Sequence, residues 1–249
     1  MSPTLGIDLG GSAIKAGAVD TAAGALIGEL RSVPTPAGAT LASTRTALAA
    51  LVAQFPDCRG PVGLAVPSVV KHGITYTAAH IDAGWVGADV AALLTAAAGR
   101  PGVVVNDADA AGVAEMRIGA GRGERGVVMM LTFGTGIGTA LFVDGRLVPN
   151  TELGHLEVGG VEAELQASAR IRTVESLDWA AWCDRVNRVL ERYHALLWPD
   201  LIIVGGGVSE HWDEFGSRLR APTRIVPAQL RQTAGVVGAA LYATGAAGC

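Results

Sequence analysis

Residues 127–155 read VVMMLTFGTGIGTALFVDGRLVPNTELGH, and this stretch says most about the fold. Two apolar runs, at 127–133 and 139–143, lie on either side of a glycine-rich turn. The dipeptide Asp144-Gly145 then favours a tight turn between the second run and a further strand. The stretch therefore predicts antiparallel strands. It does not match a dinucleotide-binding fingerprint, which needs a helix directly after the glycines.

The same stretch contains residues suited to two kinds of ligand. Gly134, Gly136 and Gly138 allow the backbone to approach a ligand closely and to point N–H groups at an anion. Glu152 and His155 can between them accept and donate the hydrogen bonds that a polyol needs. Groups for phosphate and for sugar so close together predict a kinase that acts on a small polar substrate.

Strands and helices alternate along the rest of the chain. A hairpin is predicted from the runs Leu5–Leu9 and Ala13–Val19, and buried parallel strands from the aliphatic runs at 63–66, 103–105 and 201–204. The helices predicted from apolar spacing cover 40–55, 88–98, 177–197 (with Ser176 as its N-cap), the region near 211–219, and 234–247. Because each half opens with a strand pair around a glycine turn, the pattern indicates an α/β fold of two related lobes with a cleft between them.

The composition argues against several classes of protein. The chain has 249 residues, half of them apolar and 17% charged, which suffices for one large domain or two lobes and disfavours disorder. A net charge of −4 provides no electrostatic footprint for nucleic acid or for an anionic membrane surface. The three cysteines form no CxxC pair and the N-terminus has no signal-peptide pattern, so we expect a reducing, cytoplasmic compartment and neither a disulfide framework nor a zinc site.

The uncharged segment 232–249 raises the question of a membrane span. It consists mostly of Ala, Gly and Thr, and it lacks a run rich in Leu, Ile or Phe. We therefore expect a small-residue helix that packs against protein.

The first candidate phosphate site lies at the N-terminal hairpin. Asp8 ends an apolar strand, where a carboxylate is costly unless it faces a cleft or a metal. Gly10 and Gly11 allow the turn to wrap around a phosphate, Ser12 adds a hydroxyl, and Lys15 follows in the next strand. The alternative is an ordinary hairpin turn with a solvated aspartate. Neither lysine of the chain belongs to a GK[ST] sequence, so the site is not that of a P-loop nucleotide hydrolase.

A second candidate site, Asn106-Asp107, comes directly after a buried strand. Side chains at that place emerge at the carboxyl edge of a sheet, where ligands bind in α/β proteins. Capping of the following helix by Asp107 or Asp109 is a strong alternative, because acidic residues stabilise the first turn of a helix.

A third candidate site consists of Glu152, His155 and Glu164. The Glu-x-x-His spacing also occurs in metal half-sites on helices, but Asn150 and Gly154 suggest a loop, and the sequence offers no partner motif. A surface loop with ordinary polar residues is the remaining alternative.

A fourth candidate site is the run Gly205, Gly206 and Gly207, which follows the strand at 201–204. It is either a tight turn from strand to helix or a surface on which a bulky, flat group lies against the backbone.

Together these motifs resemble the ROK family of sugar kinases, and within it the polyphosphate glucokinase branch. The resemblance extends through GIDLGGSAIKAG, the Asn106-Asp107 segment, LTFGTGIGTALFVDGRLVPNTELGH, LDWAAWCDRVN, PDLIIVGGGVS and AGVVGAAL. It implies the actin-like, ribonuclease H-like α/β fold, in which two lobes close around a central cleft. Residues 1–107, joined by a C-terminal helix at 234–249, would form one lobe, and residues 108–233 the other.

The resemblance also assigns roles to individual residues. Asp107 is similar to the general base that takes the proton from the sugar hydroxyl, and Asp8 to the acidic residue that helps to hold Mg²⁺ through water. The sugar-binding set would be Asn106, Asp107, Glu152, His155 and Glu164. The phosphate-binding set would be Gly10, Gly11, Ser12, Lys15, Gly134, Thr135 and Gly136. The donor groove would include Gly205, Gly206, Gly207, Arg170 and Arg172.

The chain departs from the family pattern at the sugar and donor loops. It lacks the cysteine-rich zinc motif, as the polyphosphate branch does, and it has no helix-turn-helix of the repressor branch ahead of its first strand. His80 stands where the branch usually has asparagine, and Ser68 where glycine is usual, so an altered acceptor is an alternative. Arg170 and Arg172 stand where lysine-containing sequence is expected, and they keep the positive charge that an anionic chain requires.

The resemblance implies a kinase that phosphorylates the 6-hydroxyl of glucose or a similar hexose, with inorganic polyphosphate or ATP as donor, Mg²⁺ as cofactor and a homodimeric assembly. Two alternatives stay open. One is an ATP-dependent ROK kinase for another or a modified sugar, and the other is a sugar-sensing homologue that has lost catalysis.

Overall fold

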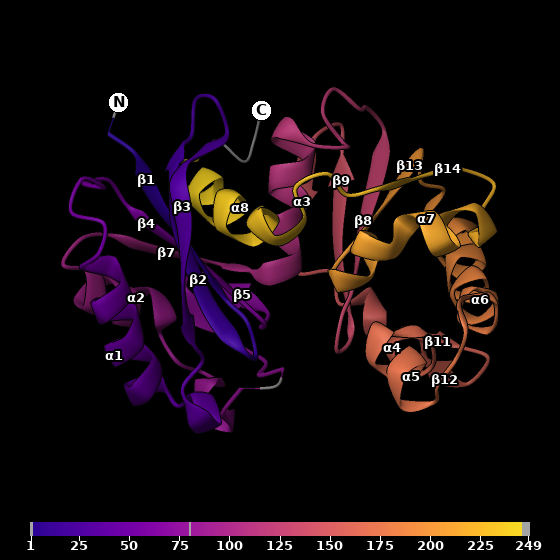
Figure 1. Ribbon diagram of the computed structural model, residues 1–249, viewed down its shortest axis with the longest axis horizontal. Helices are drawn as coiled ribbons and strands as arrows, with labels where there is room; N and C mark the ends of the chain where they lie inside the picture. The colour runs from indigo at the N-terminus through magenta and orange to yellow at the C-terminus, as the bar shows by residue number, and fades with distance from the viewer. Residues whose placement is uncertain (1, 80, 246–249) are drawn as a thin grey trace. The chain divides into compact units, whose positions relative to one another are not determined.

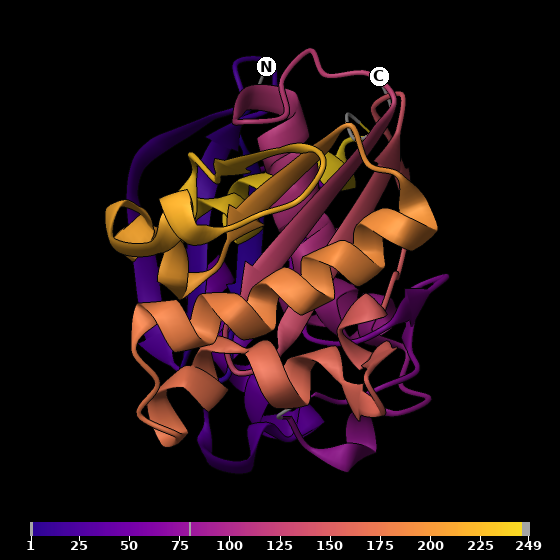
Figure 2. The ribbon, with the colours of Figure 1, turned by 90° about the vertical axis from the view of Figure 1, so that its right-hand side faces the viewer.

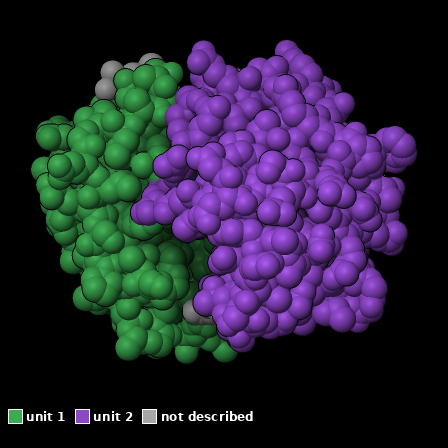
Figure 3. Space-filling view, turned by 45° about the vertical axis from the view of Figure 1, so that its right-hand side comes forward, with its two compact units in different colours: residues 1–114, 233–249 green, residues 115–232 purple. Residues whose placement is uncertain are grey.

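The computed structural model describes residues 2–79 and 81–245, and the contacts within it divide the chain into two compact units (Figure 1, Figure 3). Unit 1 comprises residues 1–114 and 233–249, and unit 2 comprises residues 115–232. The lobe boundaries predicted at 107/108 and 233/234 remain predictions. The α/β class is confirmed, since each unit contains a mixed sheet and helices.

Unit 1 is built on a five-stranded sheet in the order β3-β2-β1-β4-β7. Its strands are β1 (Thr4–Leu9), β2 (Ala13–Asp20), β3 (Ala25–Pro34), β4 (Val62–Val66) and β7 (Gly102–Asn106). β1 and β2 form the predicted hairpin, and β1, β4 and β7 are parallel. The polar residues that follow β7 are therefore placed at the carboxyl end of the parallel strands, as predicted.

Helices on both faces of this sheet bury its apolar side chains (Figure 1). They are α1 (Leu41–Val52), α2 (Val90–Ala98), α3 (Asp107–Ile118) and α8 (Ala234–Ala243). Leu48 and Leu51 of α1 and Leu94 of α2 pack into the larger apolar core. Thr40 and Asp89 cap the N-termini of α1 and α2 through their side-chain oxygens, so both helices begin after a good N-cap residue.

The helix α8 explains the uncharged segment near the C-terminus. A Cβ at Gly6 of β1 would overlap the carbonyl oxygen of Val236, and a Cβ at Gly63 of β4 would overlap that of Ala239. The backbone of α8 therefore lies directly on the sheet, at an approach that only small residues permit. The predicted small-residue helix packed on protein is confirmed over Ala234–Ala243, while residues 246–249 lie outside the described part.

Unit 2 repeats the strand order of unit 1, as β10-β9-β8-β13-β14. Its strands are β8 (Val127–Phe133), β9 (Ile137–Val143), β10 (Arg146–Val148), β13 (Leu201–Gly205) and β14 (Arg224–Pro227). β8 and β9 flank the glycine turn as an antiparallel pair, and β13 is parallel to both β8 and β14. The predicted similarity of the two halves thus appears as one topology used twice.

The long helix α6 (Trp179–Leu197) crosses one face of the second sheet (Figure 2). Trp182, Val186, Val189 and Tyr193 lie at helical spacing on its inner face and are fully buried, as that spacing predicts. Leu196, which the same spacing would place on this face, is 48% exposed near the C-terminal end of the helix. The predicted N-cap Ser176 is wrong, because its φ of 52° lies in the left-handed region. Asp178 is the N-cap instead, and its carboxylate accepts a hydrogen bond from the N–H of Ala181 at 2.7 Å.

Shorter elements complete the fold. The helix predicted near 211–219 is broken into the 3₁₀ turn Gly207–His211, α7 (Trp212–Phe215) and the 3₁₀ turn Gly216–Arg218. The remaining elements are β5 (Val70–Lys71), β6 (Ile74–Thr75), β11 (Glu157–Val158), β12 (Val161–Glu162), α4 (Ala163–Ala167), α5 (Ala169–Val174), and the 3₁₀ turns Ala37–Ala39, Ala83–Trp85, Leu153–His155 and Arg231–Thr233. Among the described residues, no helix combines the length and the apolar character that crossing a membrane requires.

Candidate functional site

The carboxylate of Asp8 lies at the end of β1, in register with Lys15 on β2. Gly235 at the start of α8 leaves room for it, since a Cβ there would come within 2.7 Å of the Asp8 carboxyl carbon. Burial raises the pKa of Asp8, and the positive charge of Lys15 acts in the opposite direction. A cation bound beside this carboxylate would therefore stabilise its charged form.

The turn after Asp8 is closed by the chain itself. The N–H of Gly10 donates to the carbonyl of Ala13 at 3.0 Å, and the hydroxyl of Thr35 donates to the carbonyl of Gly10 at 2.6 Å. Gly11 and Ser12 are exposed, and a Cβ at Gly11 would meet no atom within 4 Å. The turn therefore offers open backbone at its tip.

Asn106 and Asp107 join the end of β7 to the start of α3. Asn106 is buried, and its side-chain oxygen accepts hydrogen bonds from the N–H groups of Ala108 at 2.9 Å and Asp109 at 3.1 Å. Asn106 thus caps α3, a role that sequence reasoning had considered for Asp107 or Asp109. Asp107 is half-buried, and one of its carboxylate oxygens accepts from the N–H of Ala108 at 2.8 Å. The cap fixes the first turn of α3 and with it the position of the Asp107 carboxylate.

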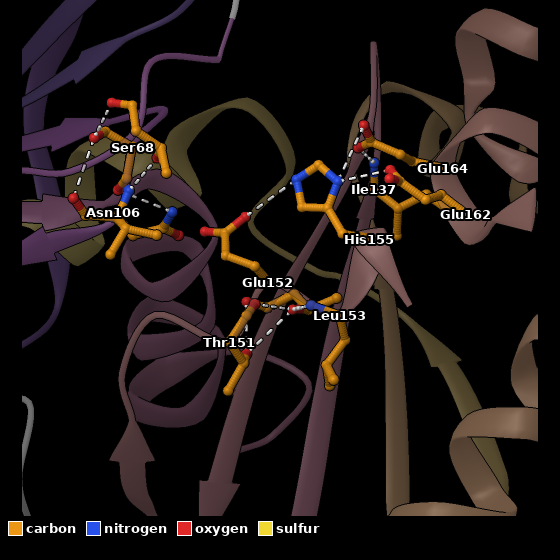
Figure 4. Close-up of polar contacts among 12 residues, drawn as sticks. Ser68, Asn106, Ile137, Thr151, Glu152, Leu153, His155, Glu162 and Glu164 are labelled. Carbon is orange, nitrogen blue, oxygen red and sulfur yellow. Dashed lines mark hydrogen bonds and ion pairs between the residues drawn. The ribbon is translucent and has the colours of Figure 1, made fainter. Parts of the chain in front are cut away.

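Ser68 supports Asn106 through its backbone (Figure 4). The amide nitrogen of Asn106 donates to the carbonyl of Ser68 at 3.2 Å, while the Ser68 hydroxyl donates to the carbonyl of Thr77 at 2.6 Å. Ser68 is 2% exposed, so its hydroxyl serves the loop in which it lies. The other residue considered for an altered acceptor, His80, lies outside the described residues.

The glycine turn of unit 2 is held from two sides. The N–H of Arg170, in the first turn of α5, donates to the carbonyl of Gly134 at 3.0 Å. A Cβ at Gly136 would overlap the carboxylate of Glu164, and the N–H of Ile137 donates to that carboxylate at 3.3 Å. The turn is therefore in contact with α5, which belongs to the predicted donor side, and with Glu164, which belongs to the predicted sugar side.

Glu152 and His155 lie on a loop that packs against β9 and α6. The N–H of Leu153 donates to the hydroxyl of Thr139 at 3.2 Å, and the hydroxyl of Tyr193 donates to the carbonyl of Leu153 at 2.8 Å. A Cβ at Gly154 would overlap the carbonyl oxygen of Ile137, so the glycine between Glu152 and His155 is needed for close packing. These contacts hold the segment TELGH in place as a rigid loop.

Three carboxylates surround His155 (Figure 4). Its Nδ1 atom lies 2.9 Å from Oε2 of Glu162 and 3.8 Å from Oε1 of Glu164, and its Nε2 atom lies 4.0 Å from Oε2 of Glu152. The hydrogen bond with Glu162 is the main cause that raises the pKa of His155, and the charges of the three carboxylates add to it. Burial raises the pKa of Glu152, against the effect of His155.

Sequence reasoning missed Glu162. Its contact with His155 depends on the short hairpin of β11 and β12, whose register has no distinctive apolar pattern. The ligand atoms of His155, Glu162 and Glu164 lie within 4.8 Å of one another, so they could hold a metal ion. Exposed acidic groups also gather without one, and the hydrogen bond to Glu162 accounts for the arrangement.

The three glycines after β13 have different surroundings. Gly206 has a φ of 79°, and a Cβ there would overlap the backbone of Phe133. A Cβ at Gly205 would lie 2.8 Å from the terminal methyl of Met130, whereas one at Gly207 would meet nothing within 4 Å. Internal packing thus accounts for Gly206, a small shift of the flexible Met130 side chain would admit a Cβ at Gly205, and Gly207 is the glycine with open space beside it.

Arg172 is engaged within unit 2. Its guanidinium lies 3.5 Å from the centroid of the Trp179 ring, and the ring nitrogen of Trp179 donates to Glu214 at 2.8 Å. The cation–π contact holds the charge of Arg172 over the start of α6. Trp179, which is not among the residues predicted for the donor groove, therefore contacts one of them.

Comparisons with known proteins agree on one family. The model of the ROK family matches residues 4–168. The chain is 46% identical over 237 residues to a polyphosphate glucokinase of Mycobacterium tuberculosis (strain CDC 1551 / Oshkosh), covering 95% of this chain and 89% of the relative. The crystal structure of an inorganic polyphosphate/ATP-glucomannokinase from Arthrobacter sp. strain KM superposes with a TM-score of 0.94 at 47% identity, covering 99% of this chain and 100% of that one. A ROK family glucokinase from Streptomyces griseus in complex with glucose and AMPPNP superposes with a TM-score of 0.82 at 26% identity, covering 98% and 99%.

Proposed function

Because the chain belongs to the ROK family, we propose that it is a sugar kinase that transfers a phosphoryl group to the 6-hydroxyl of glucose or a similar hexose. Inorganic polyphosphate is the favoured donor, and ATP is a second one, because relatives with 46% and 47% identity carry those names. Mannose is the similar hexose to test first, since one of these relatives is a glucomannokinase.

One structural observation carries this proposal. The carboxylate of Glu164 accepts a hydrogen bond from Ile137 in the glycine turn and also lies 3.8 Å from His155. A turn suited to a phosphate and a loop suited to sugar hydroxyls are thus joined by one side chain. Such a junction suits a reaction that brings a phosphoryl group to a sugar.

In the proposed mechanism, Asp107 takes the proton from the 6-hydroxyl as that oxygen forms a bond to the terminal phosphorus of the donor. The bond from this phosphorus to the bridging oxygen breaks at the same time, and the shortened polyphosphate, or ADP when ATP is the donor, leaves with the bridging oxygen. A sugar alcohol is a weak nucleophile, and a positioned base contributes on the order of 10²–10⁴ in rate. The capped start of α3 supports this role, because Asn106 holds the first turn of the helix in place. Asn106, Glu152, His155 and Glu164 would bind the remaining hydroxyls.

The phosphate groups would meet backbone N–H groups of the two glycine turns, at Gly11 and Ser12 and at Thr135 and Gly136, and the charge of Lys15. The N–H groups of Gly10 and Gly134 donate within their own turns, so these two glycines would serve by shaping the turns around the phosphates. Asp8 would hold Mg²⁺ through water. A single carboxylate fits an ion that keeps several waters and takes its other ligands from phosphates. When bound, Mg²⁺ supplies neutralising charge to the phosphoryl group, which is the main need of phosphoryl transfer.

The donor chain would extend along Gly205, Gly206 and Gly207 and toward Arg170 and Arg172. Gly207 supports this path, since it has open space where a side chain would stand. The stacking of Arg172 on Trp179 fixes a positive charge for an anionic donor. We further propose a cytoplasmic homodimer that binds neither nucleic acid nor membrane, in keeping with the net charge of −4.

A panel of hexoses, each assayed with Mg²⁺ and either polyphosphate or ATP, tests the proposal. We expect glucose 6-phosphate to form with polyphosphate, and a lower rate with ATP. Turnover with ATP alone would overturn the choice of donor. Sugar binding without turnover on any hexose would favour the sensor instead, and turnover only on another or a modified sugar would favour the altered acceptor.

A further inference from the structure

The two ring nitrogens of His155 face different groups (Figure 4). The Nδ1 atom is at hydrogen-bond distance from Glu162, and the Nε2 atom is on the side of Glu152. An ionised carboxylate only accepts hydrogen bonds, so Nδ1 carries the proton in this contact. In the neutral imidazole, Nε2 is then an acceptor for a sugar hydroxyl, and in the imidazolium it is a donor.

The backbone of Glu162 is fixed by its hairpin. Val158 pairs with Val161 in register, and the turn residues Gly159 and Gly160 both have positive φ, at 67° and 84°. The amide of Gln166 donates to the carbonyls of Val158 at 2.9 Å and Val161 at 3.0 Å. The hydrogen bonds of this hairpin therefore hold the Cα of Glu162 in a fixed position.

Among the described carboxylates that surround His155, Glu162 is the one at hydrogen-bond distance. Glu164 is engaged with the N–H of Ile137, and Glu152 lies at the opposite ring nitrogen. The orientation of the imidazole thus depends mainly on Glu162.

We propose that Glu162 is a positioning residue, which holds the imidazole of His155 through Nδ1 so that Nε2 faces the sugar. This inference rests on the proposed function, in which Glu152 and His155 bind sugar hydroxyls. Glu162 itself touches no substrate in this arrangement. Its carboxylate selects the tautomer of His155 and restricts the rotation of the ring.

Two properties of His155 follow from the contact. Without Glu162 the ring would rotate more freely, and sugar affinity would fall. The hydrogen bond with Glu162 also raises the pKa of His155, and the charges of Glu164, Glu162 and Glu152 add to this effect. Removing Glu162 should therefore lower the pKa of His155.

The test combines a sugar-binding measurement with NMR of the imidazole. Glu162→Ala removes the acceptor, Glu162→Gln keeps an oxygen acceptor without charge, and Glu157→Ala is the matched control. Glu157 lies directly opposite Glu162 in the same hairpin and is exposed. Glucose affinity is measured by calorimetry, glucose KM and kcat by assay, and the pKa and tautomer of His155 by long-range ¹H–¹⁵N spectra assigned with His155→Asn.

We expect Glu162→Ala to weaken glucose binding about tenfold, the lower end of the loss seen when a residue that orients a metal-binding histidine is removed. The turnover number kcat should change less than the glucose KM. Glu162→Gln should weaken binding less, and it should lower the pKa of His155 by less than Glu162→Ala does, because it removes the charge and keeps an oxygen acceptor. Glu157→Ala should leave both unchanged.

The inference is overturned if Glu162→Ala leaves the tautomer and the pKa of His155 unchanged, or if Glu157→Ala has the same effects. It is also overturned if Glu162→Ala leaves glucose affinity intact while His155→Asn lowers it. Failure of the proposed function looks different, because the wild-type protein then phosphorylates no hexose while the NMR spectra still report the Glu162 contact.

Discussion

The two sheets share one strand order, yet the glycine turns at equivalent places have different surroundings. Each turn joins the first antiparallel pair of its sheet, β1 and β2 in unit 1 and β8 and β9 in unit 2. The turn at Gly10–Ser12 is closed by its own hairpin and by Thr35, and its tip is open. The turn at Gly134–Gly136 is in contact with α5 and with Glu164.

This difference shows that the repeated glycine motif determines the conformation of the turn but not the residues that surround it. The glycine spacing determines the turn, and the turn is formed locally by the strand pair. The neighbours of the turn come from segments that follow much later in the chain, such as Glu164 and Arg170. Two similar motifs can therefore serve different partners, and the second turn is in contact with Glu164, a predicted sugar-binding side chain.

The sheets also differ in the residues that follow their edge strands. β7 ends at Asn106 and is followed by Asp107, whereas β14 ends at Pro227. Only unit 1 among the described residues thus places a carboxylate directly after the edge strand of its five-stranded sheet. The proposed chemistry is asymmetric for this reason, although the topology is repeated.

The largest expected effect is the loss of kcat in Asp107→Asn, which removes the carboxylate that follows β7. Because the amide cannot take the proton, kcat should fall on the order of 10²–10⁴-fold. Asn106 still caps α3, so the melting temperature and the glucose affinity should remain close to those of the wild type. Steady-state kinetics, calorimetry and thermal unfolding measure the three quantities.

The matched control is Asp57→Asn, at an exposed turn of the same unit. It should leave kcat unchanged. Activity of Asp107→Asn near that of the control would remove Asp107 from the role of general base.

The helices that cover the two sheets provide the second contrast. α6 fills its interface with large side chains such as Trp182 and Tyr193, which are fully buried. α8 has small residues instead, and a Cβ at Gly238 would overlap the carbonyl oxygen of Ala110 in α3. Gly238→Ala should therefore lower the free energy of unfolding by about 3 kcal/mol, at the upper end for overpacking.

Chemical denaturation measures this loss, with Gly60→Ala as control. A Cβ at Gly60 would meet no atom within 4 Å, so the control should stay within about 0.5 kcal/mol of the wild type. Equal stability of the two variants would mean that α8 can move away from α3 at little cost.

The elements that were predicted correctly are those with local signals. The hairpin at β1 and β2, the strands around the Gly134 turn and the apolar face of α6 follow from glycine placement and from apolar periodicity. The ROK fold was recognised from the order of the motifs, and the superposition with solved ROK kinases confirms it. The roles of the site residues stay predictions.

The errors concern single positions, where the backbone conformation determines which residue caps a helix or contacts a neighbouring side chain. Ser176 is a good capping residue by type, but its positive φ places Asp178 at the start of α6. In the same way Asn106 caps α3 ahead of the two aspartates. Glu162 was missed because its role depends on the register of a two-residue pair of strands, and such a register has no strong sequence signal.

The smallest expected effects come from alanine substitutions in the two glycine turns, and they test whether the turns differ in their influence on glucose binding. Gly136→Ala would displace the carboxylate of Glu164 and weaken its hydrogen bond with Ile137, at a cost of about 1 kcal/mol in unfolding free energy. Because Glu164 also lies beside His155, the glucose KM should rise together with the donor KM. Gly11→Ala has open space for its methyl group, so only the donor KM should change. Steady-state kinetics with both substrates varied would reveal the difference. Equal effects of the two variants on the glucose KM would show that both turns influence glucose binding to the same extent.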